Sequence, residues 1–137
     1  MSHKRQDIRD ATYALLNTHT SVGTNVFKNR VINLQQTQLP AIDITTTSET
    51  ATPRGMNATV YIRKLELKIR IMLDALSDID DEIDDIAAEV EAILFANKSL
   101  SGTCSGSTYQ SMNIEIDDQG SKIIAVGEMI FEVNYIL

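Results

Sequence analysis

Two pairs of aspartates, each spaced four residues apart, are the residues of this sequence best suited to chemistry. Asp80 pairs with Asp84, and Asp81 with Asp85, within the stretch 78–95 (DIDDEIDDIAAEVEAILF). On a helix, side chains at this spacing lie on one face, where paired carboxylates can hold Mg²⁺ or act as acid and base in hydrolysis. A small metal-dependent hydrolase is therefore one hypothesis for this chain.

Other features of the sequence weigh against a metal or catalytic site at these acids. Repulsion between like charges at this spacing costs only a few tenths of a kcal/mol, so a solvated helix face tolerates it without any function. A calcium loop beginning at Asp78 requires Gly at its sixth position, where Ile83 stands. No His, Gly-rich phosphate loop or cofactor fingerprint lies nearby to complete an active site. We predict no catalytic residue, no cofactor and no bound metal.

The other reactive side chains lack partners in the sequence. Cys104, the single cysteine, lies in the Ser/Gly-rich stretch 99–108, and an inert thiol is the simpler interpretation. A lone cysteine forms no internal disulfide, which fits a reducing compartment. His3 and His19 have no Cys or carboxylate partner at ligand spacing. None of these residues extends the acid pairs into a site.

The aspartates need a helix to position them, and the surrounding pattern predicts one over 78–95. Its apolar residues recur every three or four positions, as in an amphipathic helix lying on a core. They are Ile79, Ile83, Ile86, Val90 and Ile93 or Leu94, and the opposite face is acidic. A second amphipathic helix is expected over 6–17.

The clearest strand pattern covers 60–73. Leu65, Leu67, Ile69, Ile71 and Leu73 alternate there with Lys64, Glu66, Lys68 and Arg70, so one face is apolar and the other charged. Val60 and Ile62 have the opposite parity, which indicates either a bulge near Arg63 or a strand end buried on both faces. At fourteen residues the strand is long enough to project beyond the sheet.

The remaining strands complete an α+β fold. We expect them over 26–27 (weakly), 41–47, 109–116 and 123–136, with the last two forming a terminal hairpin. The aperiodic stretch 48–59 (SETATPRGMNAT) is interpreted as an exposed loop at a hairpin tip or as a disordered connector. The prediction is one domain over 1–137: a mainly antiparallel sheet of about four strands with two helices packed on one face.

Charge is distributed unevenly along the chain. Residues 1–70 carry ten Lys or Arg against five Asp or Glu, a net charge of +5, whereas residues 71–137 carry two against fourteen, a net charge of −12. A subunit with two such faces can meet its own copies head to tail, and such contacts close into rings when the rotation permits. The alternative is a merely solvated acidic helix face.

The basic strand face is too small, and aromatics at 5% too few, to indicate direct nucleic-acid binding. No apolar run is long enough to span a membrane, and we see no signal peptide.

The order and spacing of several segments resemble the tail terminator (tail completion, minor tail protein U-like) family of long-tailed bacteriophages. The matching segments are IRDATYALL (8–16), LPAIDI (39–44) followed by Thr and Glu49, YIRKLELKIRI (61–71), DIDDEIDDIAAEVEAIL (78–94), a DDQG turn, and FEVNY (131–135). They cover nearly the whole chain in the family's order. The resemblance implies a small α+β domain that assembles as a hexameric ring, and it offers no catalytic residues.

The resemblance also implies partners and a location. The ring would cap the tail tube protein, stop its polymerisation and present a surface to a head-neck connector protein, while DNA passes through the lumen without sequence-specific binding. The protein would be assembled in the host cytoplasm, as a monomer before assembly or directly as a ring, and would reside at the head-proximal end of the virion tail. Another neck or head-completion protein on a related scaffold is the alternative.

Exposure and charge suggest which residues make protein contacts. Arg54 and Met56, in the stretch 48–59, together with the stretch 99–108, are the expected contacts with tube or neck proteins. The acidic helix face is expected on the outer surface or against a neighbour's basic strand. Its residues are Asp80, Asp81, Asp84 and Asp85, and those of the basic strand are Lys64, Lys68 and Arg70.

Overall fold

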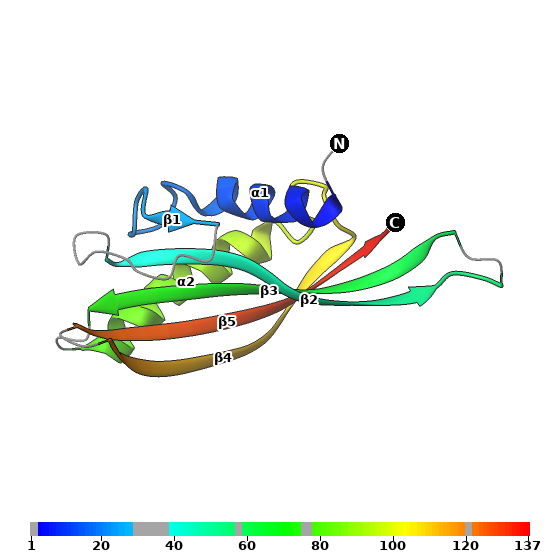
Figure 1. The fold of residues 1–137 in the computed structure, drawn as a ribbon. Helices are drawn as coiled ribbons and strands as arrows, with labels where there is room; N and C mark the ends of the chain where they lie inside the picture. Colours follow the sequence, from blue (N-terminus) through cyan, green and yellow to red (C-terminus); the bar gives the residue numbers. More distant parts are fainter. Residues whose placement is uncertain (1–2, 29–38, 57–58, 75–77, 120–121) are drawn as a thin grey trace.

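Two helices cover one face of a five-stranded sheet in the computed structural model, which describes residues 3–28, 39–56, 59–74, 78–119 and 122–137 (Figure 1). The elements, in chain order, are α1 (Lys4–Leu16), β1 (Val26–Phe27), β2 (Ala41–Pro53), β3 (Tyr61–Asp74), α2 (Ile79–Ala96), β4 (Gly106–Gln119) and β5 (Lys122–Ile136). This confirms the predicted α+β class. The sheet has five strands rather than about four, because the weak strand at 26–27 joins it as β1.

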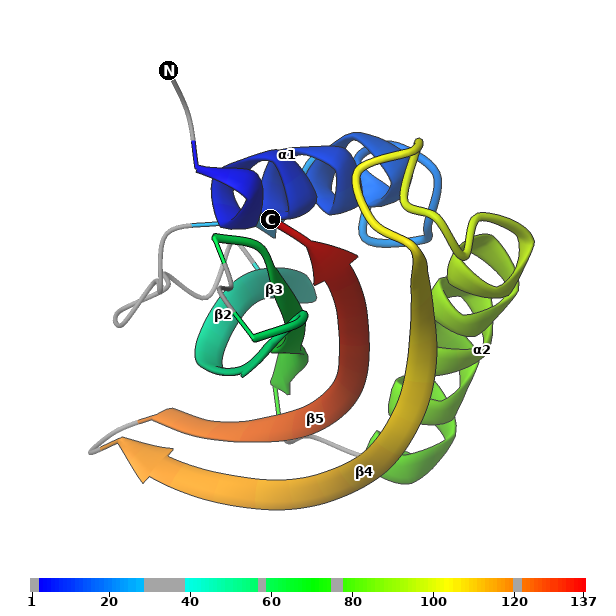
Figure 2. The same ribbon diagram turned by 90° about the vertical axis from the view of Figure 1, so that its right-hand side faces the viewer.

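The strand order across the sheet is β1-β2-β3-β5-β4. All neighbours are antiparallel except β1 and β2, which run parallel with Val26 beside Ile42. Figure 1 shows the β2–β3 hairpin projecting well beyond the helices, as the length of β3 predicted. Figure 2 shows α1 and α2 on the same side of the strongly curled sheet.

The core lies between the two helices and the sheet. Alternate residues of β3 from Leu65 to Leu73 are buried, as the sequence predicted, and β5 contributes Phe131, Val133 and Tyr135. The apolar stripe of α2 supplies buried Ile83, Ile86, Ala87, Val90 and Leu94, and α1 supplies Ile8, Thr12 and Leu16. Burial of each large aliphatic or aromatic side chain contributes roughly 1.5–3 kcal/mol.

Close packing of α2 on β5 depends on Gly127. A Cβ atom built at Gly127 would lie 2.8 Å from Cγ2 of Ile83 and 2.9 Å from Cε of Met112. Real Cβ contacts are not this short, because protein interiors are packed to crystal-like density. The glycine therefore allows the helix to approach the sheet.

The β-bulges lie elsewhere than predicted. They fall in β2 between Thr46 and Ser48, and in β4 between Tyr109 and Ser111, whereas β3 pairs with β5 without any shift near Arg63. Ile62 is 41% exposed, so the far end of β3 is not buried on both faces either. Both proposed explanations of the parity change in β3 were wrong. A bulge also reverses which side chains beyond it face the core.

The prediction of a loop over 48–59 was wrong for its first half, which belongs to β2, although the stretch does join the two strands of a hairpin. Residues from Ser48 to Pro53 pair with β3 from Glu66 to Tyr61. Beyond Pro53, the N–H of Arg54 donates to the Val60 carbonyl at 3.0 Å and closes the described part of the tip. The hairpin is therefore a two-stranded projection up to Pro53 and Tyr61 rather than a long loop.

Candidate protein-interface surfaces

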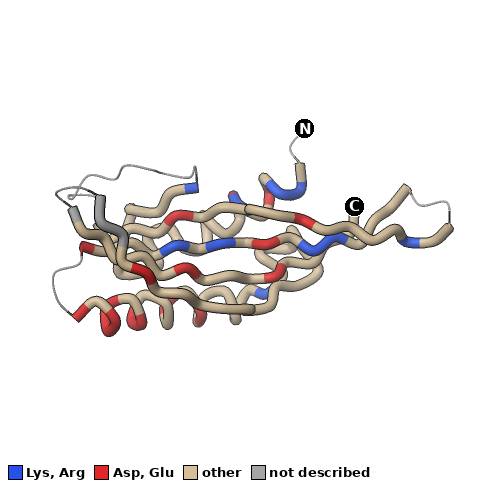
Figure 3. The backbone as a smooth tube through the Cα atoms, turned by 60° about the horizontal axis from the view of Figure 1, so that its bottom comes forward, with Lys and Arg blue, Asp and Glu red and all other residues tan. Residues whose placement is uncertain are grey.

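The acidic side of α2 faces solvent. Asp80, Asp81, Asp84 and Asp85 are all exposed, and Figure 3 shows acids spaced along this helix. Glu89 is half-buried and accepts hydrogen bonds from the backbone and hydroxyl of Ser21. Among the described residues, no group of three or more His, Cys, Asp or Glu side chains is placed to hold a metal ion. The geometry therefore lends no support to the metal-dependent hydrolase hypothesis.

The three predicted cations of β3 lie on the sheet face away from the helices, but they are not equivalent. Arg70 Nη2 is 2.5 Å from Oδ2 of Asp43, a fully buried carboxylate. Lys68 Nζ is 3.7 Å from Oε1 of Glu128 on β5. Within the described parts of the chain, only Lys64 of the three is exposed and without an ion pair. Figure 3 shows basic and acidic residues alternating over this face, so it is not a continuous positive surface.

Arg54 and Met56 lie at the free end of the projecting hairpin (Figure 1). Both are exposed, and Met56 has no contact that reduces its accessibility. Towards the base of the hairpin, Val60, Ile62 and Ile136 are also exposed. The hairpin thus presents apolar side chains to solvent along its length.

A hollow lies near the start of α2, at the end of the molecule away from the hairpin tip. It is lined by Asp78, Ile79, Asp80, Asp81, Ile114 and Ile116. The two β4 isoleucines, predicted to alternate along a strand, remain largely exposed on β4, which is an edge strand of the sheet. The hollow therefore combines an acidic rim with uncovered apolar surface.

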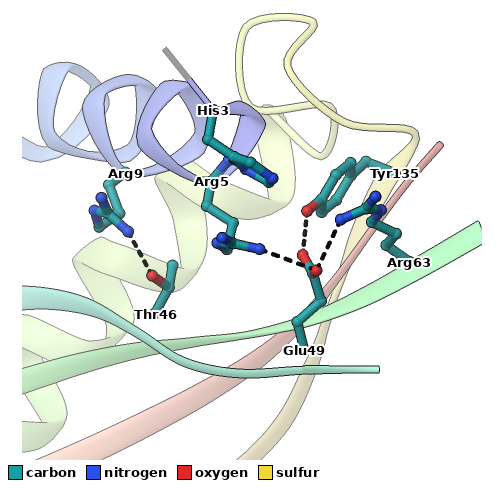
Figure 4. Close-up of polar contacts among 7 residues, drawn as sticks. All are labelled: His3, Arg5, Arg9, Thr46, Glu49, Arg63 and Tyr135. Carbon is teal, nitrogen blue, oxygen red and sulfur yellow. Dashed lines mark hydrogen bonds and ion pairs between the residues drawn. The ribbon is translucent and has the colours of Figure 1, made fainter. Parts of the chain in front are cut away.

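A charge network that the sequence analysis missed surrounds Glu49 (Figure 4). Its carboxylate is 3.0 Å from Arg5 Nη1 of α1 and 3.1 Å from Arg63 Nη1 of β3, and it accepts a hydrogen bond from the Tyr135 hydroxyl of β5. Burial raises the pKa of the Glu49 carboxyl, but hydrogen bonds from Tyr135 and Arg63 and the charges of both arginines outweigh it and hold the pKa below its ordinary value. Burial, together with the Glu49 charge, raises the pKa of Tyr135.

Two local features bring this network together. The bulge after Thr46 turns Glu49 towards the helices, opposite Leu65. At the start of α1, the N–H of Arg5 donates to His3 Nδ1, and the N–H of His3 donates to Gln6 Oε1. This reciprocal capping box fixes the first turn of α1, from which Arg5 reaches the sheet.

Part of this network was detectable from sequence. Arg63 has the same parity as the buried Leu65, and a charged side chain on an inward-facing position requires a partner. The identity of that partner was hidden, because it depends on the bulge. Burial raises the pKa of the Cys104 thiol despite a backbone hydrogen bond from Gly106 and the Lys4 charge, which favours the protonated thiol at neutral pH.

Comparison with known proteins identifies the family. The family described as phage minor tail protein U matches residues 3–135. A chain in the solved virion of a native gene transfer agent particle has a similar fold, with a TM-score of 0.53, 13% identity, and coverage of 97% of this chain and 98% of that one. No curated protein sequence matches. None of the helices in the described residues is long and apolar enough to cross a membrane. The chain belongs to the phage minor tail protein U family.

Proposed function

We propose that this protein is a tail terminator, which forms a hexameric ring on the end of the phage tail tube. The observation that carries the proposal is the family match over residues 3–135. Supporting it, the subunit has a projecting hairpin at one end and a cluster of exposed acids near the other (Figures 1 and 3). A subunit whose two ends differ in this way is suited to head-to-tail contacts between copies. Such contacts can close into a ring.

The mechanism we propose is steric and electrostatic. One ring face docks on the last ring of tail tube protein and occupies the surface to which the next tube subunits would add. The opposite face then offers a docking surface to the head-neck connector protein. Each step is a protein–protein contact, so the function requires no catalytic residue, and we propose that the protein is not an enzyme. DNA passes through the lumen without sequence-specific contacts.

The nine predicted interface residues differ in how available their side chains are for contacts between proteins. Arg54 and Met56 on the hairpin, and the four α2 aspartates, are exposed and available for contacts between proteins. Lys64 is available as well, whereas Lys68 and Arg70 are already engaged within the subunit. We therefore assign subunit contacts to the two ends of the molecule and not to the basic strand face as a whole.

Electron microscopy of the purified protein with and without tail tubes tests the proposal. The expected result is a ring at one end of each tube, and tubes that stop growing when the protein is added during polymerisation. Binding along the sides of tubes, or continued growth of tubes that carry the protein, would contradict a terminator. Binding to DNA-filled heads but not to tubes would instead identify another neck or head-completion protein.

A further inference from the structure

We propose that the β2–β3 hairpin of one subunit packs against the acid-rimmed hollow at the start of α2 in the next copy of this chain. The inference rests on the ring proposed above and names the contact that would build it. It is drawn from two surfaces of the same subunit that complement each other in polarity and charge. They are the apolar, cationic hairpin surface (Arg54, Met56, Val60, Ile62, Lys64 and Ile136) and the hollow (Asp78, Ile79, Asp80, Asp81, Ile114 and Ile116).

The hairpin surface has apolar side chains that remain exposed in the described part of the subunit. Ile62 of β3 lies directly opposite Ile136 of β5, on the sheet face away from the helices, and these side chains are 41% and 45% exposed. Val60 and Met56 continue the exposed apolar surface towards the tip. Contiguous exposed apolar surface of this kind marks sites of interaction with other molecules. The sequence from 50 to 64 contains Arg54, Arg63 and Lys64 but no Asp or Glu, so the outer part of the hairpin carries only positive charges.

The hollow has the opposite character. Ile114 and Ile116, the latter 64% exposed, form its apolar floor on the edge strand β4, while Asp78, Asp80 and Asp81 form its rim. Its volume is about 570 Å³, several times the roughly 150 Å³ that holds a benzene molecule. It can therefore accept large apolar side chains such as those of the hairpin.

Charge indicates which surface of a neighbouring copy packs best against the hollow. If two hairpins met each other, Arg54 and Lys64 would face their own copies, and two hollows meeting would bring six aspartates together. Like charges placed opposite each other disfavour a contact, whereas opposite charges favour it and fix its orientation. The hairpin therefore fits the hollow better than either surface fits itself. The two surfaces lie towards opposite ends of the subunit (Figures 1 and 3), so the contact is head to tail and can repeat around a ring.

This assignment differs from the sequence-based expectation for the hairpin. The sequence predicts that Arg54 and Met56 contact tube or neck proteins, because the pattern of their segment indicates an exposed loop. At the end of a paired-strand projection, their charge and polarity match the acidic hollow of a neighbouring copy. The faces of the ring, rather than this contact, are then left for the tube and the neck.

Cross-linking of the assembled ring tests the contact. In a Cys104→Ala background, Met56→Cys places one thiol on the hairpin and Ile116→Cys places another in the hollow. The doubly substituted protein is assembled on tail tubes, treated with a short bismaleimide and separated by denaturing electrophoresis. We expect a ladder of covalent oligomers up to the ring size. Each single-cysteine variant alone should give only monomers, and an equal mixture of the two should give dimers and nothing larger.

The outcomes separate this contact from the ring itself. Rings visible on tube ends without any ladder would overturn the contact and leave the terminator proposal standing. Covalent dimers from Met56→Cys alone, or its cross-linking to tube protein, would also overturn it. Absence of a ring from wild-type preparations would remove both proposals.

As a second measurement, Arg54→Asp and Asp81→Arg should each reduce tube-end occupancy, and the two substitutions together in one chain should recover it. Glu115→Lys, an equal charge reversal on an exposed β4 residue outside the hollow, should leave occupancy unchanged.

Discussion

Arg5 in the first turn of α1 and Glu49 in β2 are separated by 44 residues in sequence and joined by a 3.0 Å ion pair. The same carboxylate binds Arg63 and Tyr135, so a single acid connects the helix, the hairpin and the last strand. The Glu49 side chain is only 14% exposed, whereas that of Arg5 is 39% exposed, so the carboxylate is the better shielded charge of this pair. The network holds the start of α1 against the base of the projecting hairpin.

Replacing Glu49 by Gln should lower the free energy of unfolding by about 2–3 kcal/mol, because two arginines and a tyrosine hydroxyl lose their charged partner in a largely buried place. Chemical denaturation followed by circular dichroism measures the loss. Asp10→Asn is the matched control, since it removes an exposed ion pair with Lys28, and exposed pairs contribute only about 0–1 kcal/mol. Equal effects of the two substitutions would show that the network is not a source of stability.

The same network predicts how stability depends on pH. The pKa of Glu49 is lower in the folded protein than its ordinary value of 4.5, so its contribution is complete above that value and is lost as pH falls through the folded pKa. The pKa of Tyr135 is raised from 10.0, so its contribution is lost as pH rises above 10. The stability difference between wild type and Glu49→Gln should therefore shrink below about pH 4.5, and that for Tyr135→Phe above about pH 10. Differences that stay constant across both ranges would contradict these assignments.

The sequence predicted those parts of the fold whose signal is local. The alternation of β3 and the isoleucine stripe of α2 each repeat over several residues, so one segment is enough to recognise them. Residues 48–53 of β2 have no such pattern, because both faces of the hairpin are mostly exposed there. They are a strand because β3 pairs with them, and this is a contact that no short segment contains.

The candidate sites likewise differ in whether a local sequence pattern can predict them. Exposure of the α2 acids follows from helix periodicity, which the sequence shows. The position of Glu49 depends on a bulge, and the hollow depends on how far α2 covers β4. Both are consequences of tertiary packing, and sequence alone could place neither.

Gly127 offers a test of the packing between α2 and the sheet. Gly127→Ala should cost about 1–3 kcal/mol of unfolding free energy, because the new Cβ would overlap Ile83, whose buried side chain has little room to move. Gly106→Ala on β4 is the control, since a Cβ there meets nothing within 4 Å. Thermal and chemical unfolding of both variants measure the difference. If Gly127→Ala were as well tolerated as Gly106→Ala, α2 would not be in such close contact with β5.

Addition of Ca²⁺, Mg²⁺ or Mn²⁺ should leave the melting temperature unchanged. The α2 acids face solvent, and the described residues form no three-ligand group. A ligand present at 100 times its Kd would stabilise the folded state by about 2.7 kcal/mol, which a thermal-shift titration detects readily. A saturable rise in melting temperature that Asp80→Asn with Asp84→Asn abolishes would revive the metal-dependent hydrolase hypothesis.

Charge reversal on α2 should weaken the proposed ring, and the effect should become smaller as the distance from the hollow increases. Asp80→Lys with Asp81→Lys changes the rim itself. Exposed pairs contribute about 0.2–1 kcal/mol each, so loss of two raises the Kd of the subunit contact on the order of tenfold. Asp84→Lys with Asp85→Lys, one helical turn further on, should have the same sign and a smaller size.

Salt provides the independent check on this electrostatic contact. The screening length falls from about 10 Å at 0.1 M to about 3 Å at 1 M ionic strength, so wild-type rings should dissociate more readily as salt is added. Rings of the Asp80→Lys, Asp81→Lys variant should respond less, because the attraction that salt screens has already been removed. Mass photometry of free rings, or counting of capped tube ends, measures both effects. A hexamer mass that stays unchanged at high salt would mean that apolar burial alone holds the subunits together.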